Sequence, residues 1–367
     1  MGNVSNLIKV QIKRTLTLLK QDLYLYLLIL IIAIDSGVTC YIYGYESMLD
    51  FFAYLVELKR VIVPSIASFL FVYTIYMYRI GVKQPIKYMF NKSNALPKHI
   101  PQLVSGLILL SAISVFISNY TSLKALIPLI HPFSYDRVLH DIDLKIFLGH
   151  EPWRLILGDK HSPYITAFLN LAYNLWFLFL WWILLYFVFN PTKKNRSQYL
   201  ITFVLSWFVI GVLLAMTFSS AGPAFSNLID SKNNNYLTLM GVLNEDNNWL
   251  IEQNSVIKIW ALGTQNELWQ SYSTGKEMLG SGISAMPSMH VSMATLMALG
   301  MYSVNRMLGI AAWCYVLVIY IGSFTLGWHY AVDGVVSAIF TYAIWFTCGL
   351  FTNRSHPTFK RQAREDY

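Results

Sequence analysis

The sequence predicts an all-α, polytopic membrane protein, a helical bundle with about eight transmembrane helices around a six-helix core. Apolar residues (Ala, Val, Ile, Leu, Met, Phe, Trp, Tyr and Cys) make up 56% of the 367 residues, and only 13% are charged. Soluble domains have roughly 45–50% apolar and about 25% charged residues. The apolar residues also fall in runs of about 20, the length that a helix needs to cross the hydrocarbon core. Aromatic residues reach 16%, and Trp and Tyr collect at membrane–water boundaries.

Eight apolar runs mark the predicted spans. No water in the hydrocarbon core is available to bond a free backbone group, so each crossing segment is expected to be a helix. The last three runs follow one another closely, so their connections must be short. We expect the spans at roughly 23–43, 62–82, 102–120, 166–189, 199–218, 285–304, 308–327 and 330–351.

Basic residues predict the orientation of these spans. Lys and Arg cluster in the N-terminal arm, in the second, fourth and sixth connections, and in the C-terminal tail. With eight spans, all these segments lie on one side, which the positive-inside rule places in the cytoplasm. Both termini are then cytoplasmic, and the long segments 121–165 and 219–284 are extracytoplasmic. The net charge of +8 does not indicate nucleic-acid binding, because the basic residues lie in short clusters between apolar runs.

The chain is expected to have three parts. Residues 1–100 contain a basic amphipathic arm, expected to lie on anionic lipid, and a two-helix extension. Residues 101–352 form the six-helix core, and residues 353–367 form a basic cytoplasmic tail. Segment 219–284 shows no strong periodicity and is expected to cap the outer ends of the helices.

The entrance to the sixth predicted span carries a candidate anion site. Pro287 suits the first turn of a helix, where its missing N–H is not needed. The free N–H groups of such a turn attract anions, and the hydroxyl of Ser288 adds a donor that either caps the helix or binds phosphate. His290 follows within the same turn.

The entrance to the eighth predicted span carries His329 and Asp333, which share one face of a helix because they are four residues apart. Both entrances are expected on the same membrane side, so the two histidines and the carboxylate can converge. A neutral imidazole can attack phosphorus, a carboxylate can orient it, and a second histidine can transfer the proton. Either histidine alone is commonly only a membrane-boundary residue, and Asp333 alone is commonly a helix cap. Their joint pattern favours catalysis.

A second polar cluster leaves two interpretations open. Asp136, His140 and Asp143 share a helical face by their spacing. They predict either a metal site or an interfacial helix with ordinary hydrogen bonds, and the second is the more common arrangement.

The motifs Pro287-Ser288-x-His290 and His329-x-x-x-Asp333 resemble the second and third motifs of the type 2 phosphatidic acid phosphatase superfamily. Tyr135-Asp136-Arg137-x-Leu139 and Ala221-Gly222-Pro223 are similar to its aureobasidin-resistance branch, which includes inositol phosphorylceramide synthases. The resemblance covers roughly residues 105–350. It implies that His329 is the nucleophile, His290 the acid and base, and Asp333 the orienting carboxylate, with no metal and no cofactor. It also implies Gly222, Ser288 and Ser323 as substrate-binding positions.

Two departures from the phosphatase branch bear on the substrate. We find no match to its first motif, Lys-x6-Arg-Pro, and Ser323 stands where its third motif has an Arg. Both differences remove cations that would hold a phosphate dianion, which favours a phosphodiester donor with a single charge. Replacement cations could come from the extracytoplasmic segments, at Arg137, Lys145 or Lys276.

The predicted function is therefore the transfer of a phosphoryl-headgroup unit from a phospholipid to an alcohol, through a phosphohistidine on the extracytoplasmic side. The alternative within the same chemistry is a lipid phosphate phosphatase that hydrolyses a monoester. A lipid transporter or scramblase is a third reading, but its ionisable groups would be expected near the bilayer midplane rather than at one face. A catalytically inactive scaffold is a fourth, and it conflicts with the presence of all three catalytic residue types.

Overall fold

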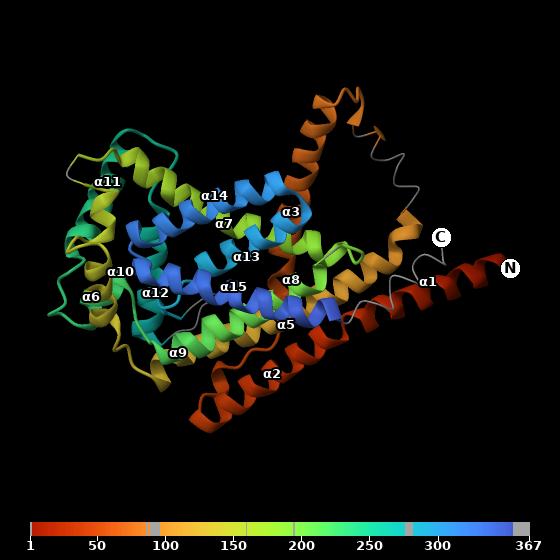
Figure 1. The fold of residues 1–367 in the computed structure, drawn as a ribbon, viewed down its shortest axis with the longest axis horizontal. Helices are drawn as coiled ribbons and strands as arrows, with labels where there is room; N and C mark the ends of the chain where they lie inside the picture. The colour runs from red at the N-terminus through yellow and green to blue at the C-terminus, as the bar shows by residue number, and fades with distance from the viewer. Residues whose placement is uncertain are drawn as a thin grey trace.

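The computed structural model describes residues 2–85, 87–88, 96–158, 160–193, 195–275 and 282–354. Every regular element among these residues is helical, as the composition predicts. Figure 1 shows most of the long helices packed in one bundle, with shorter helices gathered at one end and the helix of residues 53–79 projecting from the bundle. The long helices are α2 (Leu23–Tyr43), α3 (Ala53–Arg79), α5 (Leu96–Ile130), α7 (Pro163–Phe189), α8 (Arg196–Phe208), α13 (Met289–Val304), α14 (Arg306–Thr325) and α15 (Ala331–Arg354).

Seven helical segments in the described residues are long and apolar enough to cross a membrane. They correspond to seven of the eight predicted spans, and the fifth of them continues α8 through a π-helical turn (Val209–Leu214) to Thr217. The exception is the predicted span 285–304, where α13 has only 16 residues. At 1.5 Å per residue this helix is about 24 Å long, shorter than the roughly 30 Å hydrocarbon core. It begins late because Ser288 caps it, with its Oγ accepting the Val291 N–H at 3.4 Å.

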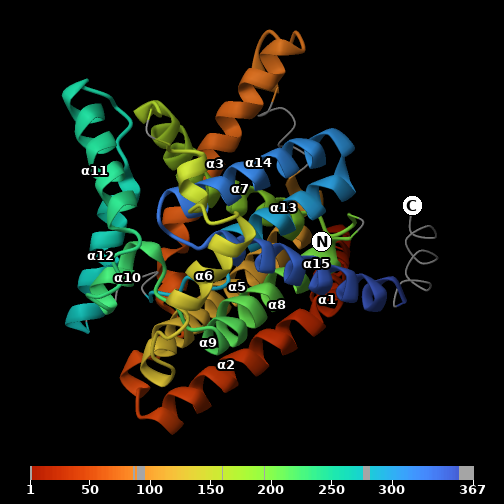
Figure 2. The ribbon, with the colours of Figure 1, turned by 60° about the vertical axis from the view of Figure 1, so that its left-hand side comes forward.

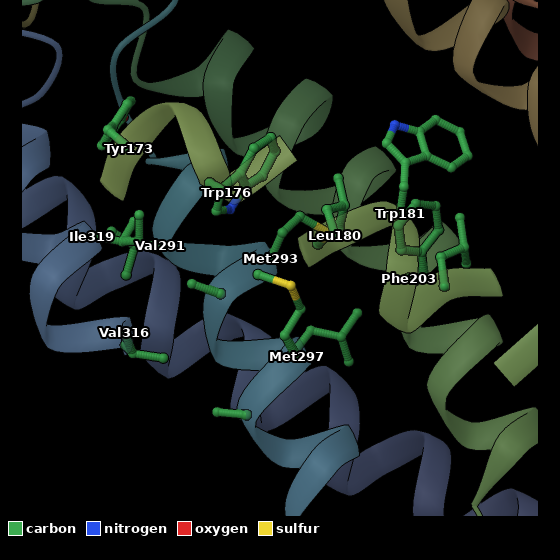
Figure 3. Close-up of a cluster of buried hydrophobic side chains, with 14 of the residues drawn as sticks. Tyr173, Trp176, Leu180, Trp181, Phe203, Val291, Met293, Met297, Val316 and Ile319 are labelled. Atoms are coloured by element: carbon green, nitrogen blue, oxygen red, sulfur yellow. The ribbon is translucent and has the colours of Figure 1, made fainter. Parts of the chain in front are cut away.

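The short helix α13 occupies the centre of the bundle, in contact with α7, α8, α14 and α15. Its residues from Val291 to Ala298 are all buried. Figure 3 shows Met293 and Met297 between Ile319 of α14 on one side and Leu180 of α7 and Phe203 of α8 on the other. Because other helices enclose α13, it does not have to match the thickness of the membrane as a lipid-facing helix does.

The N-terminal arm is a helix, α1 (Gly2–Gln21), that packs on α5. Figures 1 and 2 show α1 continuing roughly in line with α2 rather than turning away from it. The reason is a buried ion pair at the α1–α2 junction. Arg196 of α8 donates from Nη1 and Nη2 to the carboxylate of Asp22, at 2.5 and 2.9 Å. This bidentate pair fixes the junction against the core.

The helix α5 crosses two of the predicted boundaries. It begins at Leu96, before the expected start of the core at residue 101, and it runs to Ile130, well into the segment expected outside the membrane. The extension packs along it: Tyr54 at the start of α3 donates its backbone N–H to Ser118 Oγ at 3.0 Å. The two-helix extension and the core therefore share this helix.

The shorter helices cover one end of the bundle (Figures 1 and 2). Segment 219–284, for which no periodicity was expected, folds largely into helices. The reason is visible in α11, whose buried residues recur at intervals of four, three and four: Leu239, Leu243, Asp246 and Leu250. These covering helices are α6 (Asp136–Ile146), α10 (Pro223–Ile229), α11 (Leu237–Glu252) and α12 (Trp260–Thr274).

Candidate active site

The connection between α14 and α15 presents His329 at the covered end of the bundle. Gly327 has φ +75°, a left-handed conformation that glycine adopts without strain. The backbone carbonyl of Ser323 then accepts the N–H groups of Trp328 and His329, at 3.1 and 3.0 Å. The backbone on both sides of the histidine is therefore fixed before α15 begins at Ala331.

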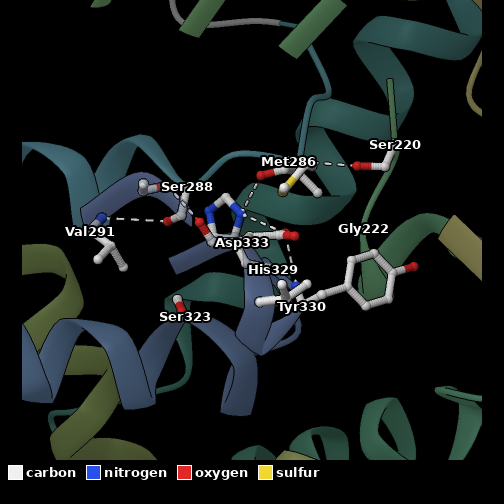
Figure 4. Close-up of polar contacts among 12 residues, drawn as sticks. Ser220, Gly222, Met286, Ser288, Val291, Ser323, His329, Tyr330 and Asp333 are labelled. Atoms are coloured by element: carbon white, nitrogen blue, oxygen red, sulfur yellow. Dashed lines mark hydrogen bonds and ion pairs between the residues drawn. The ribbon is translucent and has the colours of Figure 1, made fainter. Parts of the chain in front are cut away.

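The hydrogen bond of the His329 ring defines its tautomer (Figure 4). Nδ1 lies 2.7 Å from the carbonyl oxygen of Ala285. A carbonyl oxygen only accepts hydrogen bonds, so Nδ1 is the nitrogen that carries the proton. In the neutral ring, Nε2 is left with the lone pair that a nucleophile needs.

Asp333 lies behind the same ring and is fully buried. Its Oδ2 is 3.5 Å from His329 Nδ1, an ion-pair distance rather than a hydrogen bond. The same oxygen accepts the backbone N–H of Tyr330 at 2.9 Å, and Oδ1 has no hydrogen-bond partner among the described residues. The spacing of four residues brings the carboxylate to the ring as predicted, but the carbonyl of Ala285 holds the hydrogen bond that we expected Asp333 to make.

His290 faces His329 from the first turn of α13, with 6.2 Å between the two ring centroids. Two aromatic rings of α7 bracket it: Tyr173 stacks at 4.3 Å and Trp176 lies at 4.4 Å. The indole N–H of Trp176 also donates to the carbonyl of His290 at 3.0 Å. Neither ring was among the predicted site residues. A signal was present, because the two residues are three apart on one face of an aromatic-rich helix.

Asp136 and Asp143 of α6 hold the loops of the site. The carboxylate of Asp136 accepts the N–H groups of Ala221 and Gly222, and the hydroxyl of Tyr330 donates to it at 2.8 Å. The carboxylate of Asp143 accepts the first N–H groups of α15, from Ala331 and Val332, at 2.7 and 2.9 Å. Burial raises the pKa of Asp143 to about 7, because desolvation outweighs these two hydrogen bonds.

His140, the third residue of that cluster, contacts the hydroxyl of Tyr236 through Nδ1 at 3.1 Å. Burial lowers the pKa of His140, which favours the neutral ring. No group of three or more His, Cys, Asp or Glu side chains in the described part of the chain is arranged to hold a metal ion. The cluster makes the ordinary hydrogen bonds of the second interpretation.

A cavity of about 480 Å³ opens onto both histidines. Among the described residues that line it, Lys124 of α5 is the only Lys or Arg and Glu267 of α12 the only carboxylate. The lining also includes two buried hydrogen-bond donors near the two histidines. These are the hydroxyl of Tyr173 and the indole N–H of Trp328, and neither has a partner among the described residues. The cavity can therefore offer a phosphate one cation and several neutral donors.

The other predicted substrate-binding residues lie elsewhere. Ser288 and Ser323 are fully buried and do not line the cavity: Ser288 caps α13, and the hydroxyl of Ser323 bonds the Tyr320 carbonyl at 2.6 Å. Gly222 has φ +96°, and a Cβ there would lie 2.8 Å from the Trp328 carbonyl oxygen, so it serves close packing.

Three cations were expected from the outer segments. Arg137 is 65% exposed and pairs with Asp230, Lys145 is exposed, and neither lines the cavity. Lys276 lies outside the described residues. Lys124 takes the place that these residues were expected to fill. It was missed because α5 was expected to end at residue 120.

Lys124 also carries a motif signal. It is followed by six residues and then by His131-Pro132, the spacing of Lys-x6-Arg-Pro with His in place of Arg. His131 is exposed and does not line the cavity. The first motif is thus present in part, and its Lys position reaches the site while its second position does not.

Comparison with known proteins identifies the family to which this chain belongs. A family model described as the PAP2 superfamily matches residues 137–347, more than half of the chain. The chain belongs to the PAP2 superfamily. No curated protein and no solved structure matches it.

As a member of the PAP2 superfamily, the chain is an enzyme of the lipid phosphatase or phosphotransferase type. The region matched to the PAP2 superfamily contains both histidines and Asp333. The helices α1, α2, α3 and α5 precede it, so Lys124 is contributed from outside the matched region.

Proposed function

We propose that this PAP2 superfamily member transfers a phosphoryl-headgroup unit from a diester phospholipid to an alcohol, with His329 as the nucleophile. The observation that carries the proposal is the hydrogen bond from His329 Nδ1 to the Ala285 carbonyl, 2.7 Å long. It leaves Nε2 unprotonated in a ring that lines the cavity opposite His290. Two rings about 6 Å apart leave room for a phosphorus atom roughly 3–3.5 Å from the attacking nitrogen.

The reaction proceeds in two displacements. In the first, Nε2 of His329 attacks phosphorus, the phosphorus–oxygen bond to the lipid alkoxide breaks, and protonated His290 gives its proton to that alkoxide. In the second, neutral His290 takes the proton of the acceptor hydroxyl, whose oxygen attacks phosphorus while the phosphorus–nitrogen bond breaks. Both histidines return to their initial states, and the headgroup phosphate has moved from one alcohol to another.

The charges at the cavity favour a diester donor. A phosphomonoester carries close to two negative charges near neutral pH, and a diester carries one. Lys124 balances one charge, while the carboxylate of Glu267 would repel a second. Tyr173 and Trp328 supply neutral donors, which suit an anion of low charge.

The finer assignment is to the aureobasidin-resistance branch of the superfamily, and so to reactions like that of inositol phosphorylceramide synthases. It rests on Tyr135-Asp136-Arg137-x-Leu139 and on Ala221-Gly222-Pro223. In the structure these two segments meet, because Asp136 binds the backbone of Ala221 and Gly222. We place the reaction on the extracytoplasmic side, from the distribution of basic residues along the sequence.

A competition assay tests the proposal. The purified full chain is offered phosphatidic acid, phosphatidylinositol, and either ceramide or diacylglycerol as the acceptor, and products are followed by mass spectrometry. We expect a phosphorylated headgroup on the acceptor and little inorganic phosphate. Fast release of inorganic phosphate from phosphatidic acid, with no headgroup transfer, would establish the second candidate, a lipid phosphate phosphatase. The Lys124-x6-His131-Pro132 segment is the observation that favours that candidate.

A further inference from the structure

The cavity continues from the histidines into the apolar interior of the bundle. Along α7 its lining residues recur at helical spacing on one face. Leu184 lies eight residues beyond Trp176, which contacts His290, so it is about 12 Å deeper along the helix axis. Further residues of the deep part come from α5 and α8, among them Tyr120, Phe203 and Trp207.

Two indole N–H groups in this deep part have no hydrogen-bond partner among the described residues. They belong to Trp181 of α7, which is 8% exposed, and to Trp207 of α8. An indole N–H only donates, and a buried donor without an acceptor is costly in free energy. The residues that line this part of the cavity include Leu180, Leu184 and Phe203, which offer no acceptor, and Tyr120, whose hydroxyl makes no hydrogen bond with either indole.

A lipid brings a suitable acceptor to this depth. The ester or amide carbonyl at the start of an acyl chain accepts hydrogen bonds, and it is attached to an apolar chain that can enter the interior of the bundle. About five bonds of roughly 1.3–1.5 Å each separate it from the phosphorus of a glycerophospholipid. That span is comparable to the about 7.5 Å between Trp176, beside His290, and Trp181 along α7.

We propose that Trp181 and Trp207 bind the acyl carbonyl of the substrate lipid. The inference rests on the proposed function and narrows its substrate to acyl lipids, because a polyprenyl phosphate has no such carbonyl. The histidines and Lys124 bind the phosphate, and the two indoles bind the carbonyl. The apolar residues deeper in the cavity contact the first carbons of the acyl chain.

Replacing the tryptophans with phenylalanine tests this assignment, since Trp181→Phe and Trp207→Phe remove the N–H and keep an aromatic ring. Trp153→Phe is the matched control, because Trp153 is also buried with an unpartnered N–H but does not line the cavity. Binding of dioleoylphosphatidylglycerol and of its diether analogue is measured by native mass spectrometry. All proteins carry His329→Ala, so that no turnover occurs.

The protein with intact tryptophans is expected to bind the ester lipid several-fold more tightly than the diether. Each of the two variants should weaken ester binding about fivefold, as expected for one hydrogen bond of about 1 kcal/mol, and leave diether binding unchanged. Trp153→Phe should change neither affinity. Equal affinity for ester and diether before any tryptophan is replaced would overturn the inference, and so would equal weakening of both lipids by the variants.

The ester–diether comparison needs no tryptophan variant, so it tests carbonyl binding even if a variant fails to fold. Because binding is read without turnover, an ester preference with no headgroup transfer in the competition assay would defeat the proposed reaction alone. Headgroup transfer without an ester preference would defeat the carbonyl assignment alone.

Discussion

Nδ1 of His329 donates its hydrogen to the backbone carbonyl of Ala285, 2.7 Å away, across 44 residues of sequence. The hydrogen bond joins the α14–α15 connection to the segment that leads into α13, and so it ties together the two motifs that carry the histidines. It also leaves Nε2 as the unprotonated nitrogen of the neutral ring, because a backbone carbonyl cannot change its role as an acceptor when the pH changes.

Replacement of the catalytic residues should have unequal effects. His329→Ala and His290→Ala are each expected to lower kcat by about 10⁴-fold or more, and the double variant should be no worse than either, since the residues act as one unit. Asp333→Asn should lower kcat by only about 10²-fold, well short of the roughly 10⁴-fold seen where a carboxylate alone holds the ring. Single-turnover kinetics on folded variants measure this. A loss at Asp333→Asn equal to that at His329→Ala would contradict the role given to Ala285.

Lys124 is expected to bind the substrate phosphate. Lys124→Met should raise KM by about tenfold or more, since a charge-assisted hydrogen bond contributes about 1.5–3 kcal/mol, and Lys124→Arg should restore most of the affinity. Arg137→Ala is the control, because that side chain is exposed and paired with Asp230. Steady-state kinetics measure KM for each variant. An unchanged KM in Lys124→Met would show that this lysine does not bind the substrate phosphate.

Activity should survive metal removal. The carboxylate oxygens of Asp136 and Asp143 accept hydrogen bonds from backbone N–H groups of the site loops, so they are engaged in holding those loops. We expect unchanged turnover after dialysis against EDTA. Loss of turnover that returns on adding one divalent cation would show instead that the Asp136, His140 and Asp143 cluster binds a metal.

The stability of the protein should depend on pH through Asp143. Its pKa is raised to about 7 in the folded protein, from 3.8, so between these values the folded state binds more protons than the unfolded state. The contribution of this group to the free energy of unfolding therefore falls as pH rises from about 4 to about 7.

Asp143→Asn removes that contribution, so the difference in Tm between pH 5 and pH 8 should shrink in the variant. Asp141→Asn serves as the control, because Asp141 is exposed on the opposite face of the same helix. This variant should keep the original difference in Tm between the two pH values. Thermal unfolding in detergent provides the measurement. An Asp143→Asn protein with the full original pH dependence would refute the assignment.

The topology is tested by labelling. In a Cys314→Ser background, which removes the exposed natural cysteine, we introduce Thr192→Cys or Asn234→Cys. Both positions are exposed and lie in connections predicted on opposite sides. A membrane-impermeant maleimide applied to sealed cells should label position 234 alone. Labelling of position 192 alone would invert the orientation, and labelling of both would rule out this arrangement of spans.

Much of the fold was predictable because burial in lipid imposes a length and an apolar composition that a sequence displays directly. The α2 helix matches its predicted span, 23–43, at both ends. The predicted helix boundaries were least accurate where a helix is surrounded by other helices rather than by lipid. The α13 helix is shorter than a span, and α5 continues ten residues beyond the predicted end of its run at residue 120.

The sequence by itself determined the membrane bundle and the candidate catalytic residues, His290, His329 and Asp333, because local spacing and composition are enough to recognise them. Only the tertiary structure decided what surrounds them. Lys124, Tyr173 and the carbonyl of Ala285 come from segments far apart in the chain, and their convergence depends on how the helices pack. A backbone carbonyl is present at every residue, so no sequence pattern can mark the one that orients the His329 ring.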